Sequence, residues 1–251
     1  MRVLSGNVAH PGFDSDPRLA WPLRREALRA VLQRCDADLL CLQEVSCEQC
    51  DDLCRWLPGF GHHGQVPRID LRDPLNSIFF RHARFALIAA GGYWLSEQPQ
   101  VIGSRSWDSI YPRTAAWVRL AERSSGHELR VTVTHLDNVG ALARERQARL
   151  LVDEMLTLPG DYPQVLAGDL NCDAASPAVA YIRTHFADTW EAVHGAVDPG
   201  PTRRDIDGDE RIDWIFSRGL RVTAARMVRD TPGGVAPSDH CFLTADLQLD
   251  E

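Results

Sequence analysis

The segment Val165 to Asp173 (V-L-A-G-D-L-N-C-D) places a carboxylate and an amide at the end of a short apolar run. In extended backbone, residues i and i+2 point to the same side. We therefore expect Asp169 and Asn171 to share one face while Leu170 turns into the core. Polar groups at the end of a buried strand suit catalysis or metal binding, but Gly-Asp also begins many ordinary turns. The segment alone leaves a functional site and a simple turn as alternatives.

Comparable polar residues end, interrupt or precede other apolar segments of the chain: Asn7, Glu44, His135, Asp213, Asp239 and His240. Oxygen donors of this kind are the ligands that Mg²⁺ or Mn²⁺ prefers, with water and a substrate phosphate completing the coordination. Clusters of cysteine and histidine, which would favour zinc, do not occur among these strand-end residues. The set therefore predicts a hard divalent cation as cofactor, beside groups that can move a proton.

Six short motifs follow one another along the chain: S-G-N-V at 5–8, L-Q-E-V at 42–45, T-H-L-D at 134–137, G-D-L-N at 168–171, R-I-D-W-I-F at 211–216 and S-D-H at 238–240. Each is weak evidence alone, because each is also compatible with a turn, a helix cap or a surface pair. In this order, over nearly the whole chain, they resemble the endonuclease/exonuclease/phosphatase superfamily of metal-dependent phosphoesterases. The resemblance implies a DNase I-like α/β fold of four layers, with two mixed β-sheets flanked by helices and the site at one edge.

The resemblance also implies which residues bind the metal and activate water. Glu44 is expected to be the principal metal ligand, helped by Asn7 and Asp239. Asp169 is expected to activate the attacking water, and Asn171 to orient that water or the phosphate.

The remaining roles concern the histidines and the substrate. His240 is expected to be the catalytic histidine, held by Asp213, and His135 to contact the phosphoryl oxygens. The segment R-T-A-A-W at 113–117 resembles a bacterial branch of the family in which this arginine faces the substrate, so Arg113 is a candidate substrate-binding residue. Asn138 occupies a further position of that branch that is expected to contact the substrate.

An in-line attack on phosphorus builds negative charge on the phosphoryl and leaving oxygens, and a divalent cation stabilises that charge. A carboxylate close to the metal-bound water can accept its proton, and a histidine beside a carboxylate favours its charged form. Two bases therefore remain compatible with the sequence: Asp169 and the Asp213–His240 pair. We favour Asp169.

Helical and strand patterns mix throughout the chain, without a repeat or a linker, so we expect residues 1–251 to form a single domain. The spacing predicts helices over Arg24–Cys35, Cys47–Leu57, Leu142–Leu156 and Pro177–Thr184. It predicts strands over Arg2–Val8, Asp38–Gln43, Ser77–Arg81, Phe85–Trp94, Ala115–Leu120, Leu129–Thr134, Gln164–Ala167, Ile212–Phe216, Arg221–Arg229 and Cys241–Gln248.

The composition limits the partners. The chain has 27 basic and 35 acidic residues, a formal net charge of −8, so tight binding of duplex DNA is not expected. A small-molecule phosphoester or a short nucleic acid end remains as substrate, nuclease action on RNA or single-stranded ends is the alternative, and a catalytically silent binding module is the rival from another class. Seven cysteines without a framework spacing favour a reducing, cytoplasmic location, and no apolar run is long enough to span a membrane. The oligomeric state is left open.

Three further features each have two interpretations. Cys47, Cys50 and Cys54, with His62–His63 nearby, suggest zinc, but their i, i+3, i+7 spacing also puts them on one helical face with Leu53 and Trp56, and packing is favoured. The segment Asp205–Glu210 resembles a calcium loop without its length or closing glutamate, so a solvated loop is favoured. Packing is likewise favoured over stacking on a substrate ring for three tryptophans: Trp94, Trp107 and Trp117.

Overall fold

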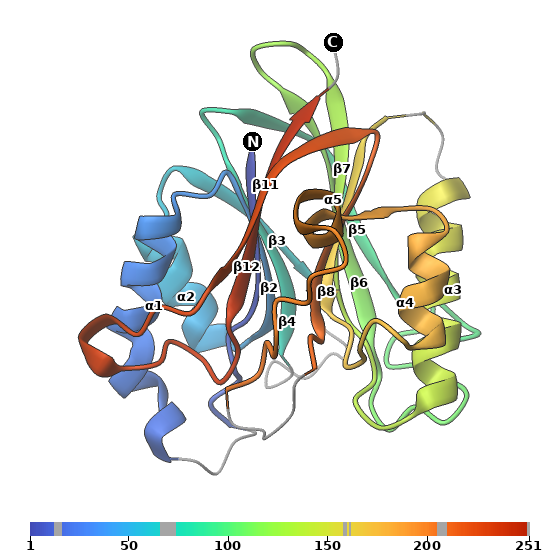
Figure 1. The fold of residues 1–251 in the computed structure, drawn as a ribbon, viewed down its shortest axis with the longest axis horizontal. Helices are drawn as coiled ribbons and strands as arrows, with labels where there is room; N and C mark the ends of the chain where they lie inside the picture. Colours follow the sequence, from blue (N-terminus) through green and yellow to red (C-terminus); the bar gives the residue numbers. More distant parts are fainter. Residues whose placement is uncertain (13–16, 66–73, 158–159, 161, 205–209, 250–251) are drawn as a thin grey trace.

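Two mixed β-sheets of six strands each face one another at the centre of the molecule, and helices cover their outer faces (Figure 1). The computed structural model describes residues 1–12, 17–65, 74–157, 160, 162–204 and 210–249. The predicted four-layer α/β sandwich is confirmed.

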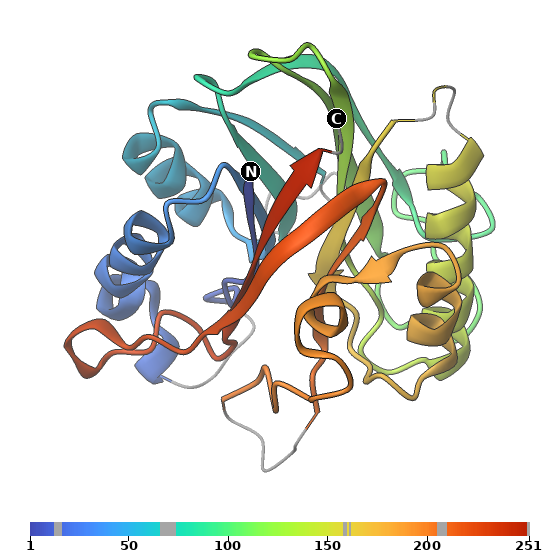
Figure 2. The same cartoon turned by 45° about the horizontal axis from the view of Figure 1, so that its top comes forward.

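The first sheet contains the first and the last of the described strands (Figure 2). Its strands, in spatial order, are β11 (Leu220–Val228), β12 (Phe242–Leu249), β1 (Arg2–Asn7), β2 (Leu39–Val45), β4 (Leu75–Arg81) and β3 (Phe60–Gln65). Strands β1 and β2 are parallel, and Asn7 lies opposite Gln43 at their carboxyl ends. This register places Asn7 beside the segment that carries Glu44.

The second sheet is built from the middle of the chain. Its strands, in spatial order, are β5 (Phe85–Trp94), β6 (Thr114–Glu122), β7 (Glu128–His135), β8 (Gln164–Asp169), β10 (Asp213–Arg218) and β9 (Ala187–Asp188). Strands β7 and β8 are parallel, with His135 opposite Asp169. Strand β10 is antiparallel to β8 and sets Asp213 opposite Asp169. Three candidate residues from distant parts of the sequence therefore form one row across neighbouring strands.

Three groups of apolar residues hold the layers together. The first fills the space between the sheets and includes Val3, Phe80 and Val131. The second packs helices α3 (Ala141–Thr157) and α4 (Pro177–Arg183) on one outer face. The third packs α1 (Trp21–Cys35) and α2 (Cys47–Trp56) on the other (Figure 1). The continuously apolar pattern of β2 and β8 follows from this burial on both sides.

The observed elements differ from the predicted ones at particular places. Helix α1 begins three residues before the predicted start, because Pro22 occupies its first turn, where a missing N–H costs nothing. The sequence patterns also missed β3, β9 and the short helix α5 (Thr189–His194). Strand β3 has the sequence F-G-H-H-G-Q, which lacks the apolar alternation and β-branched residues of typical strands. None of the helices in the described part of the chain combines the length and apolarity that crossing a bilayer requires.

Candidate active site

The side chain of Asn7 connects the two sheets at the edge where the candidate residues meet. Its amide nitrogen donates to Glu44 Oε1 at 3.0 Å and to Asp169 Oδ2 at 3.1 Å. Its oxygen accepts from the backbone N–H of Ala9 at 2.9 Å. Asn7 is 2% exposed, so these bonds are formed away from bulk water. One residue thereby fixes two carboxylates that come from different sheets.

A β-bulge directs Glu44 toward this edge. The pairing of β2 with β4 shifts register between Leu42 and Val45, and Glu44 has a left-handed backbone with φ of 59°. A non-glycine residue in this region is strained and is held there by its surroundings. The second carboxylate oxygen of Glu44 accepts from His10 N at 3.0 Å. The bulge re-aims the side chain, as bulges beside functional sites commonly do.

The segment after β8 corrects one expectation. Strand β8 ends at Asp169, and Asn171 is not extended but left-handed, with φ of 50°. Its N–H donates to Asp169 Oδ1 at 2.9 Å, so the two residues form a side-chain turn rather than sharing a strand face. Its amide nitrogen donates to Leu136 O at 3.0 Å. Leu170 is buried in the core as expected.

The histidine of the S-D-H motif is paired with a buried carboxylate. His240 Nδ1 lies 2.8 Å from Asp213 Oδ2, and His240 Nε2 lies 3.8 Å from Asp169 Oδ2. Asp213 is fully buried. The ring of His135 lies on the other side, with Nε2 at 3.5 Å from Asp169 Oδ2 and Nδ1 at 3.8 Å from Glu44 Oε1. Two imidazoles therefore flank the carboxylate of Asp169.

The three buried groups at this edge have pKa values shifted in different ways by their surroundings. Burial and the nearby charge of Asp213 raise the pKa of Asp169 to about 7. Burial alone would lower the pKa of His240, but Asp213 outweighs it and raises that pKa to about 10, so His240 is an imidazolium at neutral pH. Burial, with Arg113 and His240 nearby, lowers the pKa of His135 well below its ordinary value, so that ring is neutral. The site therefore offers one charged and one uncharged imidazole.

The donor set fits a hard divalent cation. Burial and the charge of Glu44 raise the pKa of Asp239, which indicates crowded negative charge that a cation would relieve. Asp169, Asp213 and His240 also offer ligand atoms within 4.8 Å of one another, but an imidazolium has no free lone pair for a metal. Glu44 and Asp239 are therefore the better oxygen ligands. The amide of Asn7, as oriented, bridges carboxylates; it would have to turn to offer its oxygen.

The candidate substrate residues lie together beside this cluster. Arg113 donates to Asn138 Oδ1 at 3.2 Å, and its Nε lies 4.0 Å from Asp137 Oδ2. The charge of Asp169 also acts on Arg113, which indicates that the guanidinium is near the Asp169 carboxylate. Asn138 is exposed, so this pair can meet a ligand from solvent.

Three residues that support the site were not singled out from the sequence. Asp137 is fully buried and anchors the loop of Arg113. Ser238 donates to Asn7 O at 2.7 Å and accepts from His240 N at 3.1 Å. Arg24 is fully buried and donates to the backbone oxygens of residues 8, 9, 19 and 237. Only the first two lie in a recognisable motif, and a buried arginine in a helical pattern gives no sequence signal.

The structure accounts for two of the three tryptophans by packing and does not describe most of the acidic loop. Trp94 is buried, and Trp117 packs against the core with the Arg130 guanidinium 4.7 Å above its ring, so packing accounts for both. Trp107 is half-buried and has a left-handed backbone with φ of 61°. Residues 205–209 of the acidic loop lie outside the described residues.

Two mixed sheets with polar residues at one shared edge define the DNase I-like class of folds. The model of the Endonuclease/Exonuclease/phosphatase family matches residues 4–240, and the chain belongs to this family. Its members are hydrolases that act on phosphoester bonds.

Individual relatives are distant in sequence. The crystal structure of the endonuclease/exonuclease/phosphatase from Bacteroides vulgatus superposes with a TM-score of 0.90 at 25% identity, covering 99% of this chain and 98% of that one. The mannosyl-6-phosphatase Bt3783 of Bacteroides thetaiotaomicron VPI-5482 gives a TM-score of 0.83 at 27% identity, covering 98% and 99%. Uncharacterized protein R895 of Acanthamoeba polyphaga mimivirus is 22% identical, and the chain spans 43% of the length of that curated relative.

Proposed function

We propose that this chain is a divalent-metal-dependent phosphoesterase that cleaves a P–O bond by direct attack of water. The observation that carries the proposal is the meeting of two sheets at Asp169. Its carboxylate accepts from Asn7, which also holds Glu44, and it lies 3.8 Å from the ring of His240. A candidate base, a candidate metal ligand and a cation are thus within reach of one phosphoryl group.

Each residue has a role that follows from its surroundings. Glu44 and Asp239, with Asn7, would hold Mg²⁺ or Mn²⁺, which would stabilise the charge that builds on the phosphoryl oxygens. Asp169 accepts the proton of the attacking water, since its carboxylate is buried at the centre of the cluster. Asn171 orients that water.

The two histidines act on the phosphate. His240, held as an imidazolium by its 2.8 Å bond to Asp213, offsets the charge on the phosphorane oxygens. His135 is a neutral donor to a phosphoryl oxygen. This division of roles also explains the preference for Asp169 as base, because a charged imidazole cannot accept a proton.

The substrate class is a small phosphoester. A net charge of −8 opposes the phosphate neutralisation that duplex DNA requires. Asn138 is exposed and bonded to the mostly buried Arg113, so the pair offers one neutral and one charged polar group, enough for a compact ligand. The similar structure from Bacteroides thetaiotaomicron is that of a mannosyl-6-phosphatase. This similarity favours a sugar phosphate over a short nucleic acid end as the substrate.

The remaining finer points are part of the same proposal. We place all of residues 1–251 in one domain, supported by the family match over residues 4–240. The cysteines, all of which lie in the described part of the chain, show no disulfide bond. Free thiols are typical of a reducing compartment, and this supports a cytoplasmic location.

The test is a substrate comparison with Mg²⁺ or Mn²⁺ present or removed by EDTA. It uses p-nitrophenyl phosphate, bis-p-nitrophenyl phosphate, mannose 6-phosphate, single-stranded RNA and plasmid DNA. Asp169→Asn is expected to lower the rate at least ~10²-fold, the usual minimum for loss of a general base. Asp153→Asn, on the exposed face of α3, is the matched control and should leave the rate unchanged. Hydrolysis that survives EDTA or Asp169→Asn would refute the mechanism, and no hydrolysis of any substrate would favour the silent binding module.

A further inference from the structure

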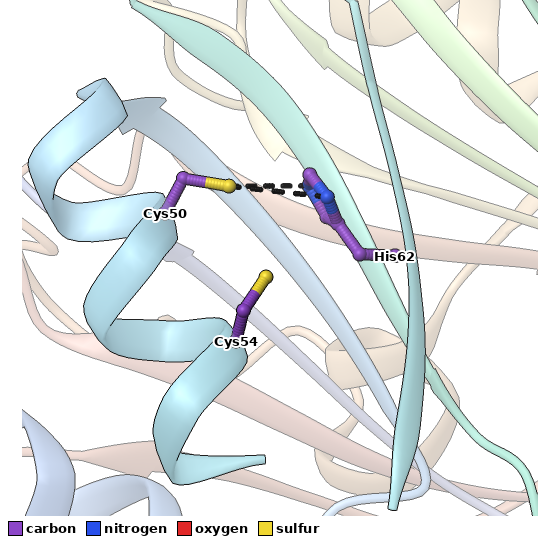
Figure 3. A group of neighbouring side chains, drawn as sticks. All are labelled: Cys50, Cys54 and His62. Atoms are coloured by element: carbon purple, nitrogen blue, oxygen red, sulfur yellow. Dashed lines mark hydrogen bonds between the residues drawn. The ribbon is translucent and has the colours of Figure 1, made fainter. Parts of the chain in front are cut away.

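A group of thiols and an imidazole lies on helix α2 and strand β3, away from the oxygen-rich edge. Ligand atoms of Cys50, Cys54 and His62 lie within 4.8 Å of one another. Figure 3 shows both thiol groups directed from α2 toward the ring of His62 on β3. None of these residues takes part in the proposed hydrolysis, so the group requires its own explanation.

Core packing does not explain why these three side chains lie together. The sequence favoured core packing of Cys47, Cys50 and Cys54, but Cys47 and Cys54 are exposed and only Cys50 is partly buried. That expectation is wrong for the two exposed residues, because the helical face that packs on the core is centred on Leu53. Missing strand β3 had also hidden how the partner is placed, since His62 lies on that strand, although the histidine itself was already noted near the cysteines in the sequence.

We propose that Cys50, Cys54 and His62 bind a zinc ion, with water as the fourth ligand. Zinc binds cysteine sulfur at about 2.3 Å and histidine nitrogen at about 2.0–2.1 Å in tetrahedral geometry. Those bond lengths put the sulfur and the nitrogen of one tetrahedron roughly 3.6 Å apart. Cys50 Sγ lies 3.8 Å from both ring nitrogens of His62, so the separation is close to that of a bound site, and a turn of the ring would aim one nitrogen at an ion shared with the thiols.

The surroundings of His62 assign its metal-binding atom. Its Nε2 lies 3.2 Å from Ser77 Oγ, and its ring stacks on Phe79 with centroids 4.4 Å apart. Histidines that bind metals commonly donate their other ring N–H to such a partner, which fixes the tautomer and the ring orientation. His62 Nε2–H therefore donates to Ser77, and Nδ1 is left to bind the metal.

The helix and the proton states are compatible with this assignment. Cys50 and Cys54 are four residues apart, on one face of α2, and a capping box between Ser46 and Gln49 fixes the first turn. Burial lowers the pKa of His62 to about 4, so its imidazole is neutral and free to bind. Burial and the neighbouring Cys54 raise the pKa of Cys50 to about 12. Zinc binds the thiolate form of cysteine, so its binding would release the thiol protons to solvent.

The structural consequence is a link between two elements. Strand β3 is the last strand of its sheet and pairs only with β4 among the described strands. A zinc ion shared by α2 and β3 would hold this edge strand to the helix layer. If zinc binds the folded chain and not the unfolded one, it would raise the stability of the protein by mass action.

The test titrates the reduced protein with Co²⁺ alone, in the presence of saturating Mg²⁺, and then displaces Co²⁺ with Zn²⁺. We expect one equivalent of Co²⁺ with thiolate-to-cobalt charge-transfer absorption, which an oxygen-rich site cannot give. Cys54→Ser should abolish that absorption, and because Cys54 is exposed this variant should still fold. Cys47→Ser, on the same helix but outside the group, is the matched control and should retain it.

Two further measurements complete the design. Ser77→Ala should weaken Zn²⁺ affinity about 10-fold, as loss of a ligand's hydrogen-bond partner does. One equivalent of Zn²⁺ should raise the Tm of the wild type but not of Cys54→Ser. Absence of charge-transfer absorption, or its equal loss in Cys47→Ser, would overturn the assignment, whatever the outcome of the hydrolysis assays.

Discussion

The buried carboxylate of Asp137 offers the sharpest test of what holds the candidate substrate residues Arg113 and Asn138 in place. Both of its oxygens accept hydrogen bonds, and it has no exposed surface. The donors are Val139 N at 3.0 Å and Gly140 N at 2.7 Å to Oδ1, and Ser109 Oγ at 3.0 Å, Ile110 N at 3.0 Å and Tyr111 N at 3.3 Å to Oδ2. Asp137 thus ties the loop before Arg113 to the start of helix α3.

The substitution Asp137→Asn keeps the shape and removes acceptors. An amide has one oxygen, so whichever way it turns, at least two of the five donors lose their partner. A buried donor left without an acceptor costs about 1–3 kcal/mol, and one of the two donors here is only partly buried. We therefore expect the free energy of unfolding at pH 7 to fall by about 2–4 kcal/mol, measured by urea denaturation.

The pH dependence gives a second, independent signature. Burial alone would raise the pKa of Asp137, but the N–H groups of Gly140, Val139 and Tyr111 outweigh it and hold the pKa below its ordinary value of 3.8. A folded-state pKa below the unfolded value contributes stability that is present above the unfolded pKa and is lost as pH falls through the folded pKa. The stability difference between wild type and Asp137→Asn should therefore shrink on acidification from pH 7 to about pH 3.

Activity supplies the third signature, because Arg113 Nε lies 4.0 Å from Asp137 Oδ2. Loss of that charge should release the guanidinium and raise KM more than it lowers kcat. Asp153→Asn is the control for an exposed acid-to-amide change. A stability loss under about 1 kcal/mol at pH 7, or a difference that stays constant down to about pH 3, would refute the argument.

The remaining predictions concern the strands, the histidine and the helix cap. Gly168→Ala should destabilise the chain by about 1–3 kcal/mol or more, because its Cβ would stand 2.1 Å from the backbone oxygen of Thr134; equilibrium unfolding that matches the wild type would contradict this. Asp213→Asn should let the pKa of His240 fall from about 10 toward its ordinary 6.5, so the basic limb of the kcat/KM profile should move to lower pH, and an unmoved limb would remove the imidazolium role. Ser46→Ala breaks the capping box of α2 and should cost about 1 kcal/mol in thermal or urea unfolding; Ser124→Ala, at an exposed position in a turn away from any helix, is its comparison.

The order of motifs was enough to predict the layers and the meeting of polar strand ends at one edge. Apolar runs that stop at a polar residue mark strand ends, and parallel pairing then brings those ends together. His135 and Asp169 are paired for this reason, although their motifs lie more than thirty residues apart. The family resemblance supplied the roles, which geometry alone could not assign.

What the sequence could not predict depends on backbone conformation and on long-range burial. A two-residue period places Glu44 on a strand face, whereas a bulge and a left-handed backbone set its direction. The same period predicted an extended Asn171, but a bond from its N–H to Asp169 closes a turn instead. In both cases a hydrogen bond or a register shift outweighs the alternation of the side chains.

The site depends on closure of the sandwich, not on either sheet alone. Asn7 of the first sheet donates to Asp169 of the second, and Ser238 ties the backbone of Asn7 to that of His240. His240 in turn is bonded to Asp213, one strand away from Asp169 in the second sheet. These bonds, with the pairing of β8 and β10, form a closed circuit through both sheets, so none of the five side chains can shift without breaking a buried bond. Because unpaired buried polar groups are costly, this circuit keeps the Asp169 carboxylate, the His240 ring and the carboxylate of Glu44 in fixed relation, as the proposed mechanism requires.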